Sequence, residues 1–304
     1  MRTLRYHRVD VFTEVAFGGN PLAVFPDADG LSTQEMQQIA REMNLSETVF
    51  VQKPTEKSAQ LRLRIFTVDR ELPLAGHPTV GTHFVLATTG RFKLKNGANV
   101  VQCQLGAGVL PVEILVEEDQ VRSVVMTQRT PAFAPELKDR EFLAEALGLD
   151  PDQLGPGELP ARVVDTGVPW LVIPILDLAA MRALAPHPSY CRQIAERCGT
   201  ELFYAFTQET LDPTCAVHAR HVWFGTVTPG EDPVTGSAAG CLASYLVFQE
   251  VMLAAPTAEV RIEQGIEVGR PGQVQALVDT ERHKISRVRV GGCAVHLGDG
   301  ELRF

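Results

Sequence analysis

The stretch Glu71-Leu-Pro-Leu-Ala-Gly-His-Pro-Thr-Val-Gly-Thr-His-Phe-Val-Leu86 returns in altered form as Glu231-Asp-Pro-Val-Thr-Gly-Ser-Ala-Ala-Gly-Cys-Leu-Ala-Ser-Tyr-Leu246, shifted by 160 positions (231 − 71). Each copy has an acidic residue, a proline, a glycine turn and a polar residue that opens an apolar helix. A helix start at a glycine turn exposes backbone N–H groups and the positive end of the helix dipole, which together bind anions. One such start in each half predicts that a single anionic ligand is held from two sides.

The bulk properties indicate a soluble two-domain protein. The chain has 304 residues, of which 45% are hydrophobic and 21% are charged, values typical of globular proteins. A net charge of −9 argues against nucleic acid or an anionic membrane as the main partner. No apolar run has the length of a membrane span, the first eight residues lack the apolar core of a signal peptide, and the six cysteines form no Cys-x-x-Cys pair. We therefore expect a cytoplasmic protein with reduced thiols.

Hydrophobic periodicity predicts many strands and few helices in each half. Strands are expected at 6–12, 22–25, 48–51, 61–66, 99–105, 109–116 and 121–126, and then within 161–176 and at 201–206, 216–224, 259–263, 273–279 and 285–290. Helices are expected after the capping box at Ser32 and at 78–87, 139–147, 188–197 and 237–248. The helices at 78–87 and 237–248 are apolar nearly all round, which is typical of helices buried on every side. Strands wrapped around a central helix satisfy this pattern, whereas a doubly wound sheet would need alternating amphipathic helices.

His77 and Ser237 stand at equivalent positions just after the two glycine turns, at Gly76 and Gly236. Both could serve only as helix caps, or both could belong to a binding site. Neither repeated stretch contains Arg or Lys, so backbone N–H groups would have to hold an anionic ligand, and a carboxylate fits that description.

Two carboxylates are candidates for acid–base chemistry. Asp232 precedes Pro233, which restricts Asp232 to an extended conformation. Glu47 stands at the mouth of an apolar strand, a border position that suits a general acid or base. The alternatives are a surface turn for Asp232 and an exposed strand end for Glu47.

Other chemistries have weaker signals. A two-thiol racemase would need a cysteine at each helix start, but Cys241 lies about one turn beyond Ser237. The spacing Cys215-x-x-His218-x-x-His221 resembles a metal site, yet it falls in a strand, where neighbouring side chains alternate between faces. We therefore expect no metal at the active site. Leu105-Gly-Ala-Gly-Val-Leu110 lacks the third glycine of a dinucleotide-binding motif.

With these motifs in place, the sequence resembles the phenazine biosynthesis PhzF-like family over nearly its whole length. The resemblance is carried by Asp10-Val-Phe-Thr, Phe17-Gly-Gly-Asn-Pro-Leu-Ala-Val24, Asn44-Leu-Ser-Glu-Thr-Val-Phe50, the two repeated stretches, and Glu263-Gln-Gly with Gly269-Arg-Pro271. One departure is the longer link Trp223-Phe-Gly-Thr-Val-Thr-Pro-Gly230 before Glu231.

The resemblance implies an α+β, diaminopimelate epimerase-like fold of two pseudo-symmetric domains, each a β-barrel-like sheet wrapped around a central helix. The two prolines within 128–136 make that stretch the candidate linker, so we place the domains at 1–128 and 129–293. The tail at about 294–304 is free to rejoin the first domain.

The resemblance also implies a function. In the founding activity of the family, the enzyme isomerises trans-2,3-dihydro-3-hydroxyanthranilate, and much of the family acts outside phenazine synthesis. Members commonly form homodimers, use no cofactor or metal, and have their site in a cleft between the domains. By resemblance, the proton-shuttling acid/base is Glu47, with His77 and Asp232 assisting, and substrate contacts come from Asn20, Ser46, Gly76, Gly236 and Ser237. We therefore expect a proton-moving isomerase of a small carboxylate. An epimerase or racemase of an amino or hydroxy acid, and a non-catalytic small-molecule-binding protein, are the alternatives.

Overall fold

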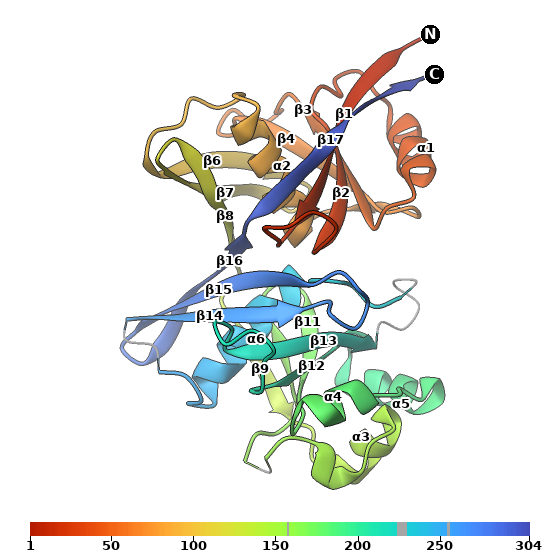
Figure 1. Ribbon diagram of the computed structural model, residues 1–304, viewed down its shortest axis with the longest axis vertical. Helices are drawn as coiled ribbons and strands as arrows, with labels where there is room; N and C mark the ends of the chain where they lie inside the picture. Colours follow the sequence, from red (N-terminus) through yellow and green to blue (C-terminus); the bar gives the residue numbers. More distant parts are fainter. Residues whose placement is uncertain (157, 224–229, 254–255) are drawn as a thin grey trace. The chain divides into compact units, whose positions relative to one another are not determined.

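The computed structural model describes residues 1–156, 158–223, 230–253 and 256–304; most of the link before Glu231 lies outside them. Two compact units are formed (Figure 1). Unit 1 contains Met1–Thr127 and Gly291–Phe304, and unit 2 contains Gln128–Val290. Each unit consists mainly of strands with few helices, which confirms the predicted α+β class.

Unit 1 is built on strands in the spatial order β17-β1-β2-β3-β4-β6-β7-β8. The β2–β3 and β4–β6 pairs are parallel, the other pairs are antiparallel, and the short β5 pairs with β4. The strands are β1 (Thr3–Val11), β2 (Asn20–Phe25), β3 (Glu47–Gln52), β4 (Leu61–Phe66), β5 (Glu71–Leu72), β6 (Gly97–Leu105), β7 (Gly108–Glu117), β8 (Gln120–Gln128) and β17 (Ala294–Arg303). Because β17 pairs with β1, the first and last strands of the chain lie side by side (Figure 1).

Unit 2 repeats this plan with strands in the order β9-β10-β11-β12-β13-β14-β15. From β17 to β7 in unit 1 and from β9 to β15 in unit 2, parallel and antiparallel pairs follow one another in the same succession. The strands are β9 (Ala132–Glu136), β10 (Arg162–Asp165), β11 (Pro169–Pro174), β12 (Phe203–Thr207), β13 (Val217–Trp223), β14 (Thr257–Gln264), β15 (Gly272–Glu281) and β16 (Lys284–Gly292). The repeat in the sequence is therefore a repeat of topology.

Each unit encloses one helix from the repeated stretches, α2 (Gly76–Thr88) in unit 1 and α6 (Gly236–Phe248) in unit 2. Both helices are buried on every side through their first two turns and beyond, as their all-round apolar sequences predicted. Helix α2 packs against β1, β2, β3, β7 and β17, and α6 packs against β10, β11, β14 and β15. A helix in this position has no solvent face, so its side chains must all fit the surrounding strands.

Close packing around α2 depends on Gly81. A Cβ atom at this position would lie 2.5 Å from Val11 Cγ2 and 2.8 Å from Leu22 Cδ2. We expect Gly81→Ala to lower the free energy of unfolding by up to about 2 kcal/mol, because overpacking costs about 1–3 kcal/mol and the helix propensity of Ala returns about 1 kcal/mol. Urea unfolding measures this change. The control is Gly298→Ala, where the added Cβ meets nothing within 4 Å, and an equal loss in both variants would contradict the explanation.

The remaining helices cover the outside of the sheets. They are α1 (Thr33–Met43), α3 (Arg140–Leu147), α4 (Leu178–Ala183), α5 (Pro188–Cys198) and the 3₁₀ turn η1 (Pro151–Gln153). The predicted capping box at Ser32 and Glu35 is present at the start of α1. Helix α1 buries Met36, Ile39 and Ala40 against a cluster that includes the stacked rings of Phe25 and Phe50. None of the described helices is long and apolar enough to cross a membrane.

The prediction of a linker at 128–136 was wrong for the second half of that stretch. Residues Ala132–Glu136 form strand β9, which pairs with β10. The two prolines suggested a linker because proline cannot donate to a strand ladder. Pro135 is accommodated because β9 pairs with β10 at the edge of its sheet, and the register is irregular between Arg162 and Val164. Proline is tolerated at such an edge.

Candidate active site

Glu47 is the first residue of β3 and follows helix α1 by a three-residue link. The helix ends at Asn44, whose φ of 49° lies in the left-handed region and turns the chain back to the sheet. Glu47 then pairs with Leu22 on the parallel strand β2. Its side chain is 16% exposed, so the carboxylate is mostly buried and still reaches the surface. The interpretation of Glu47 as a freely exposed strand end was therefore wrong.

His77 faces this carboxylate from the first turn of α2. Its Nε2 lies 3.1 Å from Glu47 Oε2, and its side chain is 8% exposed. The distance between His77 Nε2 and Glu47 Oε2 is within the range of an ion pair, but the angle between the two groups does not fit a hydrogen bond. The two side chains lie thirty residues apart in the sequence and meet because the parallel pair β2–β3 begins beside the start of α2.

Asn20 holds the other side of the His77 ring. Its Nδ2 lies 3.3 Å from His77 Nδ1, and since an amide nitrogen can only donate, Nδ1 accepts. The ring proton of neutral His77 is therefore on Nε2, the atom that faces Glu47. Asn20 is fully buried and is positioned by Gly19, whose φ is +52° and whose added Cβ would lie 2.0 Å from the carbonyl oxygen of Val11. Only glycine fits there.

The helix starts themselves are not capped by His77 or Ser237. The N-cap of α2 is Ala75 and that of α6 is Thr235, and neither side chain makes a capping hydrogen bond. The interpretation of His77 and Ser237 as caps was therefore wrong, because both lie one position inside the helix, after Gly76 and Gly236. First-turn N–H groups without a side-chain cap are the arrangement that binds anions.

In unit 2, Asp232 is tied to the turn that precedes α6. Its Oδ2 accepts from Thr235 Oγ1 at 2.7 Å, and its backbone carbonyl accepts from Gln264 Nε2 at 2.8 Å. Ser237 accepts from the indole Nε1 of Trp170 at 3.2 Å. Asp232 and Ser237 are partly exposed. The remaining predicted contact residues are Gly76, which is partly exposed, Ser46, which is exposed, and Gly236, which is buried.

The structure thus brings Glu47, His77 and Asn20 together in unit 1, and Asp232 lies near Ser237 in the sequence of unit 2. The profile of the phenazine biosynthesis-like proteins (PhzC-PhzF) matches residues 9–300. The chain belongs to this family. The isomerase of trans-2,3-dihydro-3-hydroxyanthranilate from Pseudomonas aeruginosa is 32% identical over 97% of this chain and 98% of its own length.

Solved structures agree with this assignment. The Bacillus anthracis phenazine biosynthesis protein of the PhzF family has a TM-score of 0.90 and 30% identity, and each chain covers 100% of the other. A hydroxyproline epimerase from Agrobacterium vitis has a TM-score of 0.64 at 11% identity, covering 99% of this chain and 91% of its own; that likeness shows the fold alone. The epimerase-like fold expected from the resemblance is confirmed, and this PhzC-PhzF family member is an enzyme of the isomerase class.

Gln264 is a residue of this PhzC-PhzF protein to which the sequence reasoning assigned no role. Besides its bond to the Asp232 carbonyl, its Oε1 accepts from the backbone N–H of Thr235 at 3.0 Å and from the hydroxyl of Tyr204 at 2.8 Å. The fully buried amide therefore shapes the turn between Asp232 and Gly236. Its place in the Glu263-Gln-Gly motif was the available signal.

A buried charge network supports the same turn. His218 is fully buried, with Nδ1 2.9 Å from Glu263 Oε1 and Nε2 3.0 Å from Glu267 Oε1. Two carboxylate partners require both ring nitrogens to donate, so His218 is an imidazolium. Arg220 forms a two-pronged pair with Glu231, the residue before Asp232. The metal-like spacing at Cys215, His218 and His221 thus has another explanation, since His218 is occupied by carboxylates and His221 packs edge-on against Trp170.

The thiol nearest to the second helix start is unsuited to act as a base. Cys241 is fully buried, with its Sγ 3.3 Å from Thr166 Oγ1. Burial raises the pKa of the Cys241 thiol to about 12, so at neutral pH it stays protonated. This finding agrees with the prediction that Cys241 does not supply a racemase thiol.

A cavity of about 500 Å³ in unit 1 lies at the other end of β3. It is lined by Lys53, Leu86 and Arg91 among others and does not include Glu47 or His77. Its acids Asp27 and Asp29 lie 3.0 Å from Arg91 and 3.6 Å from Lys53 respectively. Each of these acids is paired with a cation, and Lys93 adds one further positive charge to the lining.

Proposed function

We propose that the protein is a cofactor-independent isomerase that moves a proton on a small carboxylate resembling trans-2,3-dihydro-3-hydroxyanthranilate. The observation that supports this most is the trio of Glu47, His77 and Asn20. A mostly buried carboxylate faces a histidine whose Nε2–H is directed by a buried amide. A positioned carboxylate beside a histidine is an arrangement that supports general acid–base catalysis in a site with little water.

The proposed reaction leaves the atoms of the substrate unchanged in number. The Glu47 carboxylate removes a proton from a ring carbon, and the electron pair of the broken C–H bond moves into the conjugated system. The protonated Glu47 then delivers a proton to a second carbon. His77 Nε2–H lies beside the acid and donates to the substrate, and the uncapped first turn of α2 binds the substrate carboxylate through backbone N–H groups.

Contributions from unit 2 belong to the same proposal. We expect Asp232 and Ser237 to contact the substrate, with the N–H groups after Gly236 binding its polar groups, because α6 starts with the same uncapped turn as α2. The acid Glu47 is the first residue of β3. Strand β12, which has the same place in the strand order of unit 2, begins instead at Phe203. The difference between the units favours one main acid/base over a symmetric pair.

Incubation in D₂O tests the proposal. Trans-2,3-dihydro-3-hydroxyanthranilate is the first probe, followed by pools of small carboxylates, with mass spectrometry and ultraviolet absorption as readouts. Deuterium in a product with altered absorption supports an isomerase. Deuterium with inversion and unchanged absorption identifies an epimerase instead, and no deuterium in any compound that binds identifies a non-catalytic binding protein.

We also propose that the enzyme works in the cytoplasm as a homodimer. The six cysteines are all free, as expected in a reducing compartment. Light scattering coupled to size-exclusion chromatography measures the assembly, and a mass of one chain would contradict the dimer.

A further inference from the structure

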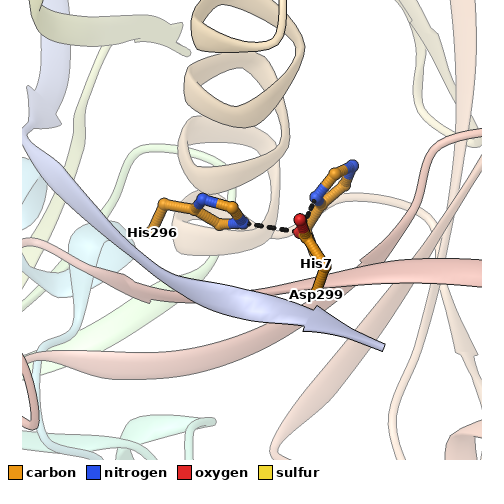
Figure 2. Close-up of side chains that lie close together, drawn as sticks. All are labelled: His7, His296 and Asp299. Atoms are coloured by element: carbon orange, nitrogen blue, oxygen red, sulfur yellow. Dashed lines mark hydrogen bonds and ion pairs between the residues drawn. The ribbon is translucent and has the colours of Figure 1, made fainter. Parts of the chain in front are cut away.

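A second group of side chains with metal-binding chemistry lies on the paired first and last strands of unit 1. His7 belongs to β1, and His296 and Asp299 belong to β17. Figure 2 shows both imidazole rings directed at the Asp299 carboxylate. None of the three residues belongs to the Glu47 site, and no local motif joins them in the sequence.

The backbone explains why these three side chains share a face. His7 and Asp299 are direct partners in the ladder, and His296 is opposite Val9. In a regular strand, residues three apart point to opposite faces. The register shifts at Arg8 and Val9, so one extra residue of β17 is accommodated and the alternation is reset. This bulge is what places His296 beside Asp299.

The three ligand atoms already converge. Asp299 Oδ1 lies 2.6 Å from His7 Nδ1 and 2.9 Å from His296 Nε2, and all three atoms lie within 4.8 Å of one another. In tetrahedral zinc sites with Zn–N bonds of about 2.0–2.1 Å, ligand atoms stand about 3.4 Å apart. Each N–O distance therefore needs to change by less than about 1 Å.

The charge state also suits a cation. The Asp299 carboxylate supplies a negative charge beside the two imidazole nitrogens. Its side chain is 66% exposed, which leaves room for an ion to enter and for water to complete its coordination. Two imidazole nitrogens with one carboxylate favour Zn²⁺ over Mg²⁺ or Ca²⁺, which prefer oxygen ligands alone.

We propose that His7, His296 and Asp299 form a zinc site that joins the first strand of the chain to the last. On binding, the ligating nitrogens carry lone pairs: a neutral ring moves its proton to its other nitrogen, and a protonated ring releases one proton to solvent. The ion stabilises unit 1 because it binds the folded ladder and not the separated strands. It takes no part in the reaction at Glu47.

Calorimetric titration of the chelator-treated, full-length protein with ZnCl₂ tests this site. We expect one ion per chain with the wild type, at least about tenfold weaker binding with His7→Ala or His296→Ala, and no heat with MgCl₂. The matched control is His283→Asn, which removes an exposed imidazole elsewhere and keeps a residue suited to a φ of 63°. Zinc should raise the melting temperature of the wild type and the control by about 5 °C and leave that of His7→Ala unchanged.

Equal zinc affinity in His7→Ala and His283→Asn would overturn the proposal, because the ion would then be bound by other groups such as the cysteines. Absence of stoichiometric binding by the wild type would also overturn it. Asp299→Asn is the second variant, since it changes one exposed oxygen and keeps the strand pairing. It should weaken zinc binding in the same way as the histidine variants.

Discussion

Glu47→Gln should lower the rate of isomerisation by about 10²–10⁴-fold, the range that a positioned general acid or base contributes. An amide has nearly the shape of the carboxylate but cannot take up the proton. His77 Nε2–H can still face the amide oxygen of residue 47, and Asn20 still holds Nδ1. The variant should therefore fold and bind substrate with nearly unchanged affinity.

Exchange of substrate hydrogen with D₂O, followed by mass spectrometry, is the direct measurement for this variant. Glu42→Gln is the matched control, because Glu42 is an exposed acid on α1 only five residues away. Full exchange by Glu47→Gln would show that another group moves the proton. Loss of exchange in both variants would show that the loss does not come from the Glu47 carboxylate.

His218→Gln should lower the free energy of unfolding by about 3–5 kcal/mol, the cost of leaving buried charges without their partner. The imidazolium lies between Glu263 and Glu267, and a neutral amide replaces neither its charge nor its two separate donor nitrogens. Glu263 keeps two backbone donors, the N–H groups of Leu211 and Asp212, whereas Glu267 loses its nearest cation. Urea unfolding measures the loss, and His283→Asn again serves as the control.

The pH dependence of that loss has a defined direction. Burial lowers the pKa of His218, but the hydrogen bonds and charges of Glu267 and Glu263 outweigh burial and raise the pKa above its usual 6.5. The stabilisation is therefore fully present below pH 6.5 and is lost as the pH rises through the raised value. At the acid end, the lowered pKa of Glu267 means that its contribution is present above pH 4.5 and is lost as the pH falls through the lowered value.

Unfolding experiments between pH 4 and pH 9 check this window. The difference in unfolding free energy between wild type and His218→Gln should be largest between the two transitions and should shrink at higher pH. A difference that is constant across the range would contradict a charged His218. A lower catalytic rate with intact folding would further connect the network to the turn at Asp232, through Arg220 and Glu231.

Much of the fold could be predicted from local patterns. The apolar sequences of α2 and α6 predicted burial on every side, and the capping box at Ser32 predicted the start of α1. Local sequence patterns failed to predict two strands whose formation depends on pairing with a neighbouring strand more than on their own composition. Strand β9 contains Pro135 and yet pairs at an edge, and β17 was not predicted as a strand because its two glycines and its charged residues lack alternation.

The candidate site likewise has a part that the sequence could predict and a part that it could not. Glu47, His77 and Asn20 were found from motifs and resemblance, and their roles stay predictions. Their mutual distances could not be predicted, because they depend on how the beginnings of β2 and β3 lie beside the start of α2. Gln264 and His218 were not assigned, since a buried amide or histidine shows its purpose only through partners that are distant in the sequence.

Sequence alone was sufficient for the duplication, the class of fold and the family, because helix period, strand alternation and glycine turns act over a few neighbouring residues and occur twice. Tertiary structure alone decided that the helix starts are uncapped, that His218 is held between two carboxylates, and that His7 meets His296 and Asp299. Those arrangements arise from contacts across the sheet, where register and a single bulge determine which side chains meet.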